Sequence, residues 1–235
     1  MLRLGLLGGM SWESSVVYER LINERVRERL GGVASADLLI RSFNFADIEA
    51  LQAKGEWEEA GRVLASAASA LESAGADAIV LATNTMHQVA DAIIEVISIP
   101  LLHIVTATGE AITRAGAKKV LLLGTRYTME QPFYKDALAT QFDLEVVTPD
   151  DYEREALHHI IYDELVQGII NDDSRARVIE IINRAKASHN IEGVIAGCTE
   201  IELLVQQEHI DVTYFPTTTL HAHYAAEFAL NGEVS

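Results

Sequence analysis

The chain alternates short apolar runs with longer amphipathic segments, and this alternation limits its possible folds more than any other feature. The apolar runs predict buried strands at residues 2–7, 36–43, 77–82, 119–123, 144–147 and 193–196. Helical spacing of apolar residues predicts helices at 13–30, 57–74, 86–97, 106–115, 130–140, 153–168, 174–188, from about 200 and at 218–230. Strands that alternate with helices form βαβ units, so we predict an α/β protein whose sheet is mostly parallel.

The two halves of the chain contain the same two motifs in the same order. Leu6-Leu7-Gly8-Gly9 resembles Leu122-Leu123-Gly124-Thr125, and segment 79–85 resembles segment 194–200. The spacing from Gly8 to Thr83 differs by only one residue from that between Gly124 and Cys198. We therefore predict two similar parallel-sheet domains related by a pseudo-twofold axis. Such an axis would place Thr83 and Cys198 at equivalent strand ends, facing one cleft.

Four of the predicted strands are followed by polar or glycine-containing motifs. They are Gly8-Gly9-Met10-Ser11, Thr83-Asn84-Thr85, Gly124-Thr125-Arg126 and Cys198-Thr199-Glu200. Parallel α/β proteins bind ligands beyond the carboxyl ends of their strands, and the N-terminus of a following helix attracts a carboxylate. Ser, Thr and Asn are also ordinary helix caps, which is the better explanation for any one motif alone. Four motifs in symmetric positions favour a ligand site.

Cys198 is the single cysteine of the chain, so no disulfide can form within it. A lone cysteine is most often a small buried apolar residue. Here it ends a predicted strand and precedes a predicted helix, whose N-terminus would lower the thiol pKa and favour the thiolate. We therefore predict that Cys198 has a chemical role, as a nucleophile or as a proton carrier.

Composition excludes several other classes of protein. The net charge is −17, from 35 acidic and 18 basic residues, which disfavours binding to nucleic acid or to an anionic membrane. No apolar run is long enough to cross a membrane, and no signal-peptide pattern precedes the first strand, so we expect a cytoplasmic protein. Neither a nucleotide-binding glycine motif nor a metal-binding cluster is present in the sequence.

Four motifs together resemble those of the aspartate/glutamate racemase family: residues 5–14 (GLLGGMSWES), 82–87 (ATNTMH), 123–129 (LGTRYTM) and 197–201 (GCTEI). Their order and spacing match across nearly the whole chain. The resemblance implies two α/β domains, 1–100 plus 214–235 and 101–213, with the substrate site between them. It also implies a homodimer that uses no pyridoxal phosphate or other cofactor.

The resemblance also implies roles for individual residues. In this family two residues face opposite sides of the substrate Cα, and these positions are Thr83 and Cys198 here. Most relatives have cysteine at the first position, and a subgroup specific for L-aspartate or L-glutamate has threonine. Gln52 stands near the position of a basic residue that often holds the substrate side chain. The predicted substrate-binding residues are Met10, Gln52, Asn84, Thr85, Thr199 and Glu200.

The predicted function is racemisation of aspartate, glutamate or a related small polar amino acid by proton removal and return at Cα. Cys198 would act on one face, and Thr83 on the other, with water or His87 as a relay. Two alternatives remain open at this stage. One is a decarboxylase of the same superfamily that uses the single thiol as a proton donor, and the other is a non-catalytic amino-acid-binding protein.

Overall fold

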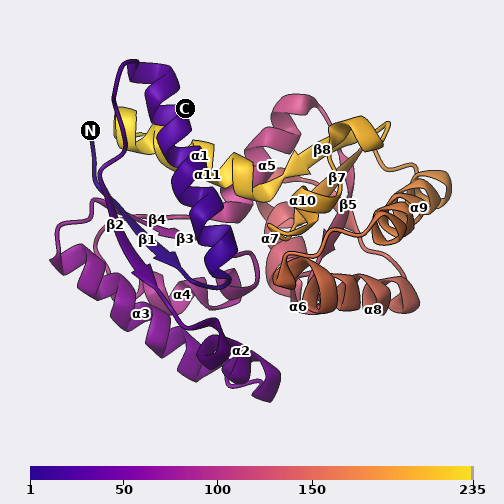
Figure 1. The fold of residues 1–235 in the computed structure, drawn as a ribbon, viewed down its shortest axis with the longest axis horizontal. Helices are drawn as coiled ribbons and strands as arrows, with labels where there is room; N and C mark the ends of the chain where they lie inside the picture. Colours follow the sequence, from indigo (N-terminus) through magenta and orange to yellow (C-terminus); the bar gives the residue numbers. More distant parts are fainter. Residues whose placement is uncertain (234–235) are drawn as a thin grey trace. The chain divides into compact units, whose positions relative to one another are not determined.

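The computed structural model describes residues 1–233 and divides into two compact units. The first unit comprises Met1–Ile104 and the C-terminal segment from His221 onward, and the second comprises Val105–Leu220. Each unit contains a four-stranded parallel sheet with helices around it (Figure 1). The prediction of an α/β fold with two similar parallel-sheet units is confirmed.

The sheet of the first unit has the strand order β2-β1-β3-β4. Its strands are β1 (Leu4–Gly8), β2 (Leu38–Ser42), β3 (Ala78–Leu81) and β4 (Leu101–Leu102). In the registers Leu7 pairs with Leu81 and Val80 with Leu102. The loops after β1 and β3 therefore leave the sheet side by side, at its carboxyl edge.

Two apolar clusters cover the two faces of this sheet, because successive strand side chains point to opposite faces. Leu4, Leu6 and Val80 pack with α1 (Trp12–Leu30) and α11 (Thr217–Asn231). Leu7, Ile79 and Leu81 pack with α3 (Trp57–Ser73). The remaining helical segments of the unit are α2 (Phe45–Lys54), a 3₁₀ helix (Thr85–Val89) and α4 (Ala90–Ile94). Figure 1 shows α3 and α1 on opposite sides of the sheet.

The second sheet has the order β6-β5-β7-β8. This order matches that of the first sheet when β5, β6, β7 and β8 are taken as the equivalents of β1, β2, β3 and β4. Its strands are β5 (Lys119–Gly124), β6 (Glu145–Val147), β7 (Gly193–Gly197) and β8 (Thr213–Pro216). Gly124 and Gly197 are register partners at the carboxyl edge. The strand followed by Cys198, β7, thus occupies the same place in its sheet as β3, the strand followed by Thr83.

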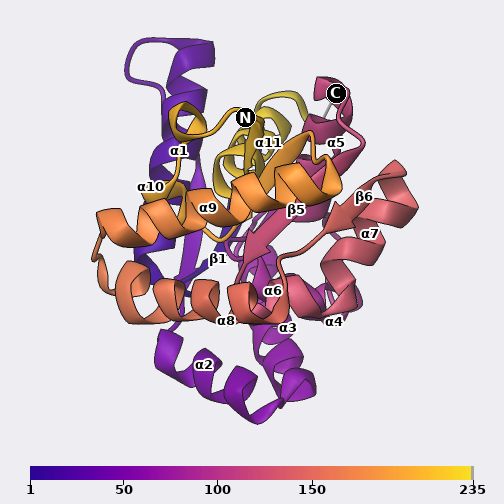
Figure 2. The same ribbon diagram turned by 90° about the vertical axis from the view of Figure 1, so that its right-hand side faces the viewer.

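The helices of the second unit follow its strands in the same alternation. They are α5 (Ile104–Ala115), α6 (Arg126–Glu130), α7 (Pro132–Phe142), α8 (Asp151–His159), α9 (Asp172–His189) and α10 (Ile201–Leu204). A π-helical turn (Ile160–Glu164) and a 3₁₀ turn (Leu165–Gln167) extend α8, and another 3₁₀ turn (Gln207–His209) precedes β8. Leu157 of α8 and Val178 of α9 pack on Leu121 and Val194, and α9 crosses in front of β5 in Figure 2.

Several elements differ from their predictions. The segment predicted as one helix at 86–97 is a 3₁₀ helix followed by the short α4, and helix α2 and strands β4 and β8 come from segments without a predicted element. In the structure β8 pairs with β7, and the chain returns to the first compact unit at His221, within α11. The division into separate folding domains stays a prediction.

Candidate active site

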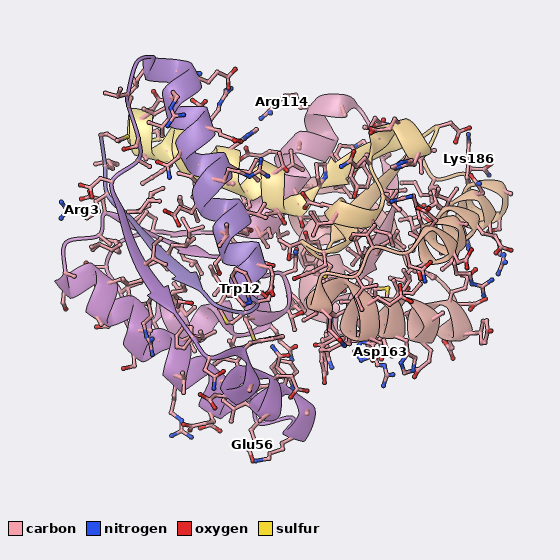
Figure 3. All side chains as sticks on the ribbon, in the orientation of Figure 1. Arg3, Trp12, Glu56, Arg114, Asp163 and Lys186 are labelled. Atoms are coloured by element: carbon pink, nitrogen blue, oxygen red, sulfur yellow. The ribbon has the colours of Figure 1, made fainter. Side chains whose placement is uncertain are left out.

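The loop between β1 and α1 is shaped by a glycine that no other residue could replace without strain. Gly9 has a φ of 83°, and a Cβ atom at this position would lie 2.3 Å from the backbone oxygen of Phe43. The Gly9 N–H donates a hydrogen bond to Ser15 Oγ over 2.6 Å. The glycine pair thus serves a tight turn against the end of β2. Trp12 follows this loop as the first residue of α1, and its side chain is largely exposed (Figure 3).

Two of the four strand-end motifs contain ordinary helix caps. Ser11 Oγ accepts from the Ser14 N–H at the start of α1, and Thr125 Oγ1 accepts from the Thr128 N–H at the start of α6, each over 3.3 Å. The helical segments after Asn84 and Glu200 have no side-chain cap of this kind. Side-chain capping is therefore a feature of the motifs after β1 and β5 and not of those after β3 and β7.

The predicted substrate-binding residues of the first unit are buried. Met10, Gln52, Asn84 and Thr85 are each less than a tenth exposed. Gln52 comes from α2, and its Nε2 donates to the Met86 sulfur over 2.9 Å. Met10 belongs to the same apolar cluster as Met86. The structure thus brings Gln52 and Met10 to Met86, which lies in the 3₁₀ helix after the Thr83 loop.

Backbone hydrogen bonds fix Thr83 on both sides. Its N–H donates to the Leu81 oxygen over 2.8 Å, and its carbonyl oxygen accepts from His87 Nδ1 over 2.7 Å. Its side chain is partly exposed. His87 therefore contacts Thr83 through the backbone, whereas the sequence-based hypothesis made His87 a proton relay to the hydroxyl.

In the second unit, the side chains of Cys198 and Thr199 both donate to one carboxylate oxygen of Glu200. Cys198 Sγ donates to Glu200 Oε2 over 2.9 Å, and Thr199 Oγ1 donates to the same oxygen over 2.8 Å. Cys198 is 7% exposed and Glu200 is 5% exposed. A buried thiol that donates to a carboxylate carries its proton, so this arrangement holds Cys198 in the acid form.

The expectation that a helix N-terminus lowers the Cys198 pKa is wrong for this arrangement. Burial raises the thiol pKa well above its usual range, and the negative charge and hydrogen bond of Glu200 raise it further. Backbone N–H groups of Glu200 and Ile201 act in the opposite direction. They do not prevail, because α10 has only 4 residues and a carboxylate lies next to the thiol.

Sequence reasoning missed Glu202 and Tyr214, which belong to the surroundings of Cys198. Glu202 accepts from the Thr218 N–H over 2.7 Å and from Thr219 Oγ1 over 3.1 Å, and burial raises its pKa to about 7. The pKa of Tyr214 is raised by burial and by the nearby charges of Glu202 and Cys198. No sequence signal distinguished Glu202 from a solvent-facing helix residue.

Some features of the described residues bear on binding without involving the predicted site. A surface groove between β2 and α3 is lined by Ile40, Arg41, Phe43, Arg62 and Leu71, among others, and contains none of the predicted site residues. Within 1–233 there is no group of three or more His, Cys, Asp or Glu residues that could hold a metal ion. Among these residues no helix is long and apolar enough to cross a membrane.

Two parallel sheets of identical strand order, with a threonine and a cysteine after equivalent strands, define a duplicated α/β protein with a polar motif in each half. The Asp/Glu/Hydantoin racemase family model matches residues 7–225. The chain therefore belongs to the Asp/Glu/hydantoin racemase family.

Individual relatives agree with this membership. The fold matches a candidate Asp/Glu racemase from Yersinia pestis with a TM-score of 0.92 and 49% identity, over 98% of this chain and 100% of that one. An aspartate racemase homologue from Pyrococcus horikoshii OT3 matches with a TM-score of 0.87 and 36% identity, over the same shares of the two chains. The broad-specificity amino-acid racemase RacX of Bacillus subtilis is 36% identical over 81 residues, which are 34% of this chain and 35% of RacX.

Proposed function

We propose that this protein is an amino-acid racemase that acts on aspartate or glutamate and moves a proton at Cα without a cofactor. The observation that supports this most is the buried thiol of Cys198, which directly follows β7 and donates a hydrogen bond to Glu200. Family membership and the racemase relatives support the reaction class. Racemisation requires a base on one face of Cα and an acid on the other.

Cys198 is the proposed base for one enantiomer, although it is protonated in the structure. The carboxylate of Glu200 is the proposed partner of the substrate α-ammonium group. An ammonium beside Glu200 would offset the negative charge that raises the thiol pKa, so substrate binding itself would favour the thiolate. The thiol proton leaves by way of Glu200 to water, so that Glu200 stays a carboxylate beside the ammonium, and the free thiolate then removes the proton from Cα.

The chemistry at Cα can be written with its bonds balanced. The Cα–H bond breaks, an S–H bond forms on Cys198, and the electron pair spreads into the substrate carboxylate as an enolate-like anion. Return of a proton from the Thr83 hydroxyl forms the new Cα–H bond on the opposite face, and the Thr83 oxygen regains a proton from water. The Asn84, Thr85 and Thr199 groups are the proposed donors that stabilise the anion.

The proposed substrate preference is for the L enantiomers of aspartate and glutamate. It rests on the threonine at position 83 and on Gln52, both of which resemble a subgroup with that specificity. The buried Gln52 amide lies against Met86 at the loop after β3. We also propose that the enzyme works as a homodimer, with neither nucleic acid nor membrane as a partner.

A second candidate function has one specific observation in its favour. A thiol that stays protonated suits a proton donor, and decarboxylases of the same superfamily need only such a donor after loss of carbon dioxide. Incubation with an arylmalonate and with L-aspartate separates the two functions. Release of carbon dioxide from the arylmalonate, with no exchange at the aspartate Cα, would support the decarboxylase.

The proposal is tested by Cα proton exchange of L- and D-amino acids in heavy water, followed by NMR. The wild-type protein is expected to exchange aspartate or glutamate, and to keep this activity after dialysis against a chelator and treatment with a carbonyl-trapping reagent. Cys198→Ser is nearly isosteric and is expected to lose the activity while it keeps its circular dichroism spectrum, because a serine hydroxyl is a far weaker acid. Wild-type activity in a folded Cys198→Ser protein would remove Cys198 from the mechanism.

A further inference from the structure

His87, His103 and His221 form a histidine cluster in the first unit, behind the loop that contains Thr83. The His87 and His103 rings lie 4.5 Å apart, centroid to centroid, and the His87 and His221 rings 5.7 Å apart. His87 and His221 are buried, at 3% and 0% exposure. Three imidazoles packed this closely need a hydrogen-bonding arrangement that keeps them neutral.

A histidine ring can carry its proton on Nδ1, on Nε2 or on both nitrogens, and the hydrogen-bond partners of His87 permit only the first form. The Thr83 carbonyl can only accept, so Nδ1 must carry a proton and donate to it over 2.7 Å. The Ile104 N–H can only donate, so Nε2 must be bare and accept from it over 3.2 Å. In a doubly protonated ring, or in the other tautomer, an Nε2–H group would face the Ile104 N–H, and two donors would meet without an acceptor. Burial also lowers the pKa of His87 well below its usual value.

The partners of His221 permit the opposite tautomer. Its Nε2 donates to the Leu102 carbonyl over 2.7 Å, and its Nδ1 accepts from the Tyr18 hydroxyl over 2.9 Å. Leu102 is two residues before Ile104, where the first unit ends, and His221 is where the chain re-enters that unit. The two histidines thus bind the leaving and returning segments of the chain, and His87 alone also binds Thr83.

We propose that His87 is a positioning residue that sets the Thr83 hydroxyl by holding the Thr83 carbonyl to the Leu102–Ile104 segment. This role rests on the proposed function of Thr83 as the proton carrier for one substrate face. The geometry supports it because Thr83 has its N–H bound to Leu81 and its carbonyl bound to His87, so the residue cannot rotate about either neighbouring peptide. With the backbone of Thr83 held in this way, its Cβ has a fixed place, and the hydroxyl can reach only the positions given by rotation about the Cα–Cβ bond.

The test compares two substitutions that each keep a different part of the imidazole. Asn places an amide donor near the position of Nδ1 and so keeps the hydrogen bond to Thr83. Gln places its amide near the position of Nε2 and loses that bond. His221→Gln is the matched control, because it alters a buried histidine of the same cluster that does not touch Thr83.

The readout is the rate of Cα exchange of each enantiomer at saturation. His87→Gln is expected to lower the rate on the Thr83 face about tenfold or more, because misplaced reacting groups lose large rate factors, and to leave the Cys198 face within about twofold. His87→Asn is expected to recover most of the loss, and His221→Gln to leave the ratio of the two rates as in wild type. Equal losses on both faces in His87→Gln, or no recovery with Asn, would overturn the positioning role.

A second measurement applies even where a variant fails to fold. Nitrogen NMR shifts of the wild-type protein at neutral pH are expected to show His87 neutral with its proton on Nδ1, and His221 neutral with its proton on Nε2. A His87 ring protonated on Nε2 would overturn the proposal. Absence of exchange of any amino acid by wild type would overturn the proposed function and, with it, the positioning role. Wild-type exchange with an unchanged rate ratio in His87→Gln would overturn the positioning role alone.

Discussion

The protonation state of Cys198 depends on Glu200, two residues further along the chain. The thiol donates to the Glu200 carboxylate, and the charge of that carboxylate is a cause of the raised thiol pKa. Thr199 donates to the same oxygen and so partly satisfies the carboxylate. This arrangement keeps the thiol protonated, and in the proposed mechanism a cation beside Glu200 would release its proton.

Glu200→Gln is therefore expected to lower the Cys198 pKa, because it removes a negative charge beside the thiol. The pKa can be followed through the ultraviolet absorbance of the thiolate during a pH titration. Thr199→Val is the control, since it keeps the carboxylate charge and is not expected to lower the pKa. A thiol pKa that is unchanged or higher in Glu200→Gln would show that burial alone sets it.

The sequence indicates candidate residues for the site but does not indicate their contacts. Cys198 and Glu200 were predicted from a motif, and the structure places them in direct contact. The roles of Ser11 and Thr125 as caps could be separated from binding only by seeing which N–H each oxygen accepts from. The hydrogen bond from His87 to the Thr83 backbone has no sequence signature, because a histidine four residues after a threonine looks the same in sequence whether or not it makes this bond.

At the scale of elements, the long helices and central strands follow their apolar patterns and the short elements do not. Helix α2 buries only Ile48 and Gln52, so it shows no apolar stripe, although Asn44 before it and Gly55 after it occupy typical cap positions. Strands β4 and β8 have 2 and 4 residues, too few for a periodic pattern. Helix α11 has a predicted position, but the binding of Glu202, from the segment of α10, to its first turn has no sequence signal.

Glu202→Ala is expected to lower the free energy of unfolding by about 1–2 kcal/mol, because the first turn of α11 loses an acceptor for its N–H groups. Glu202→Gln keeps one carbonyl oxygen as an acceptor and is expected to stay within about 0.5 kcal/mol of wild type below pH 7, where the raised pKa leaves Glu202 mostly neutral. Urea unfolding at pH 6 measures both. Equal stability of the alanine variant and wild type would show that solvent replaces the Glu202 contact.

At the scale of the whole molecule, the repeat seen in the sequence corresponds to two sheets with the same strand order. Matched spacing of the motifs made this predictable, since each half must supply the same two central strands. The boundary was harder to predict, because β8 carries no motif and the return to the first unit falls inside α11. The histidine cluster of the first unit could not be foreseen from the sequence, because His87, His103 and His221 come from separate segments of the chain.

These histidines make the stability of the protein depend on pH. Burial lowers the pKa of His221 to about 4, from an ordinary value near 6.5. Between these values the unfolded chain binds a proton that the folded chain does not, so the free energy of unfolding falls as the pH falls. For His221 alone the loss from pH 7 to pH 4 is on the order of 3 kcal/mol.

The contribution of His221 can be isolated with His221→Gln, which keeps an amide donor for the Leu102 carbonyl and cannot be protonated. From pH 7 to pH 4, the unfolding free energy of wild type is expected to fall by about 3 kcal/mol more than that of this variant. Urea unfolding of both proteins at the two pH values measures it. A difference that stays constant with pH would mean that His221 titrates normally in the folded protein.

In the proposed mechanism, Cys198 and Thr83 act on opposite faces of one substrate carbon, and the two side chains differ in acid strength. A thiol can form a thiolate far more readily than threonine can form an alkoxide, and the equilibrium between enantiomers is one to one in water, so the inequality can appear only in rates. The most direct measurement is the ratio of Cα exchange rates of L- and D-aspartate, or of L- and D-glutamate, at saturation in heavy water. We predict that the L form exchanges much faster in wild type, and that Thr83→Cys narrows the gap by raising the slower rate. Equal rates for the two enantiomers in the wild-type enzyme would contradict the account.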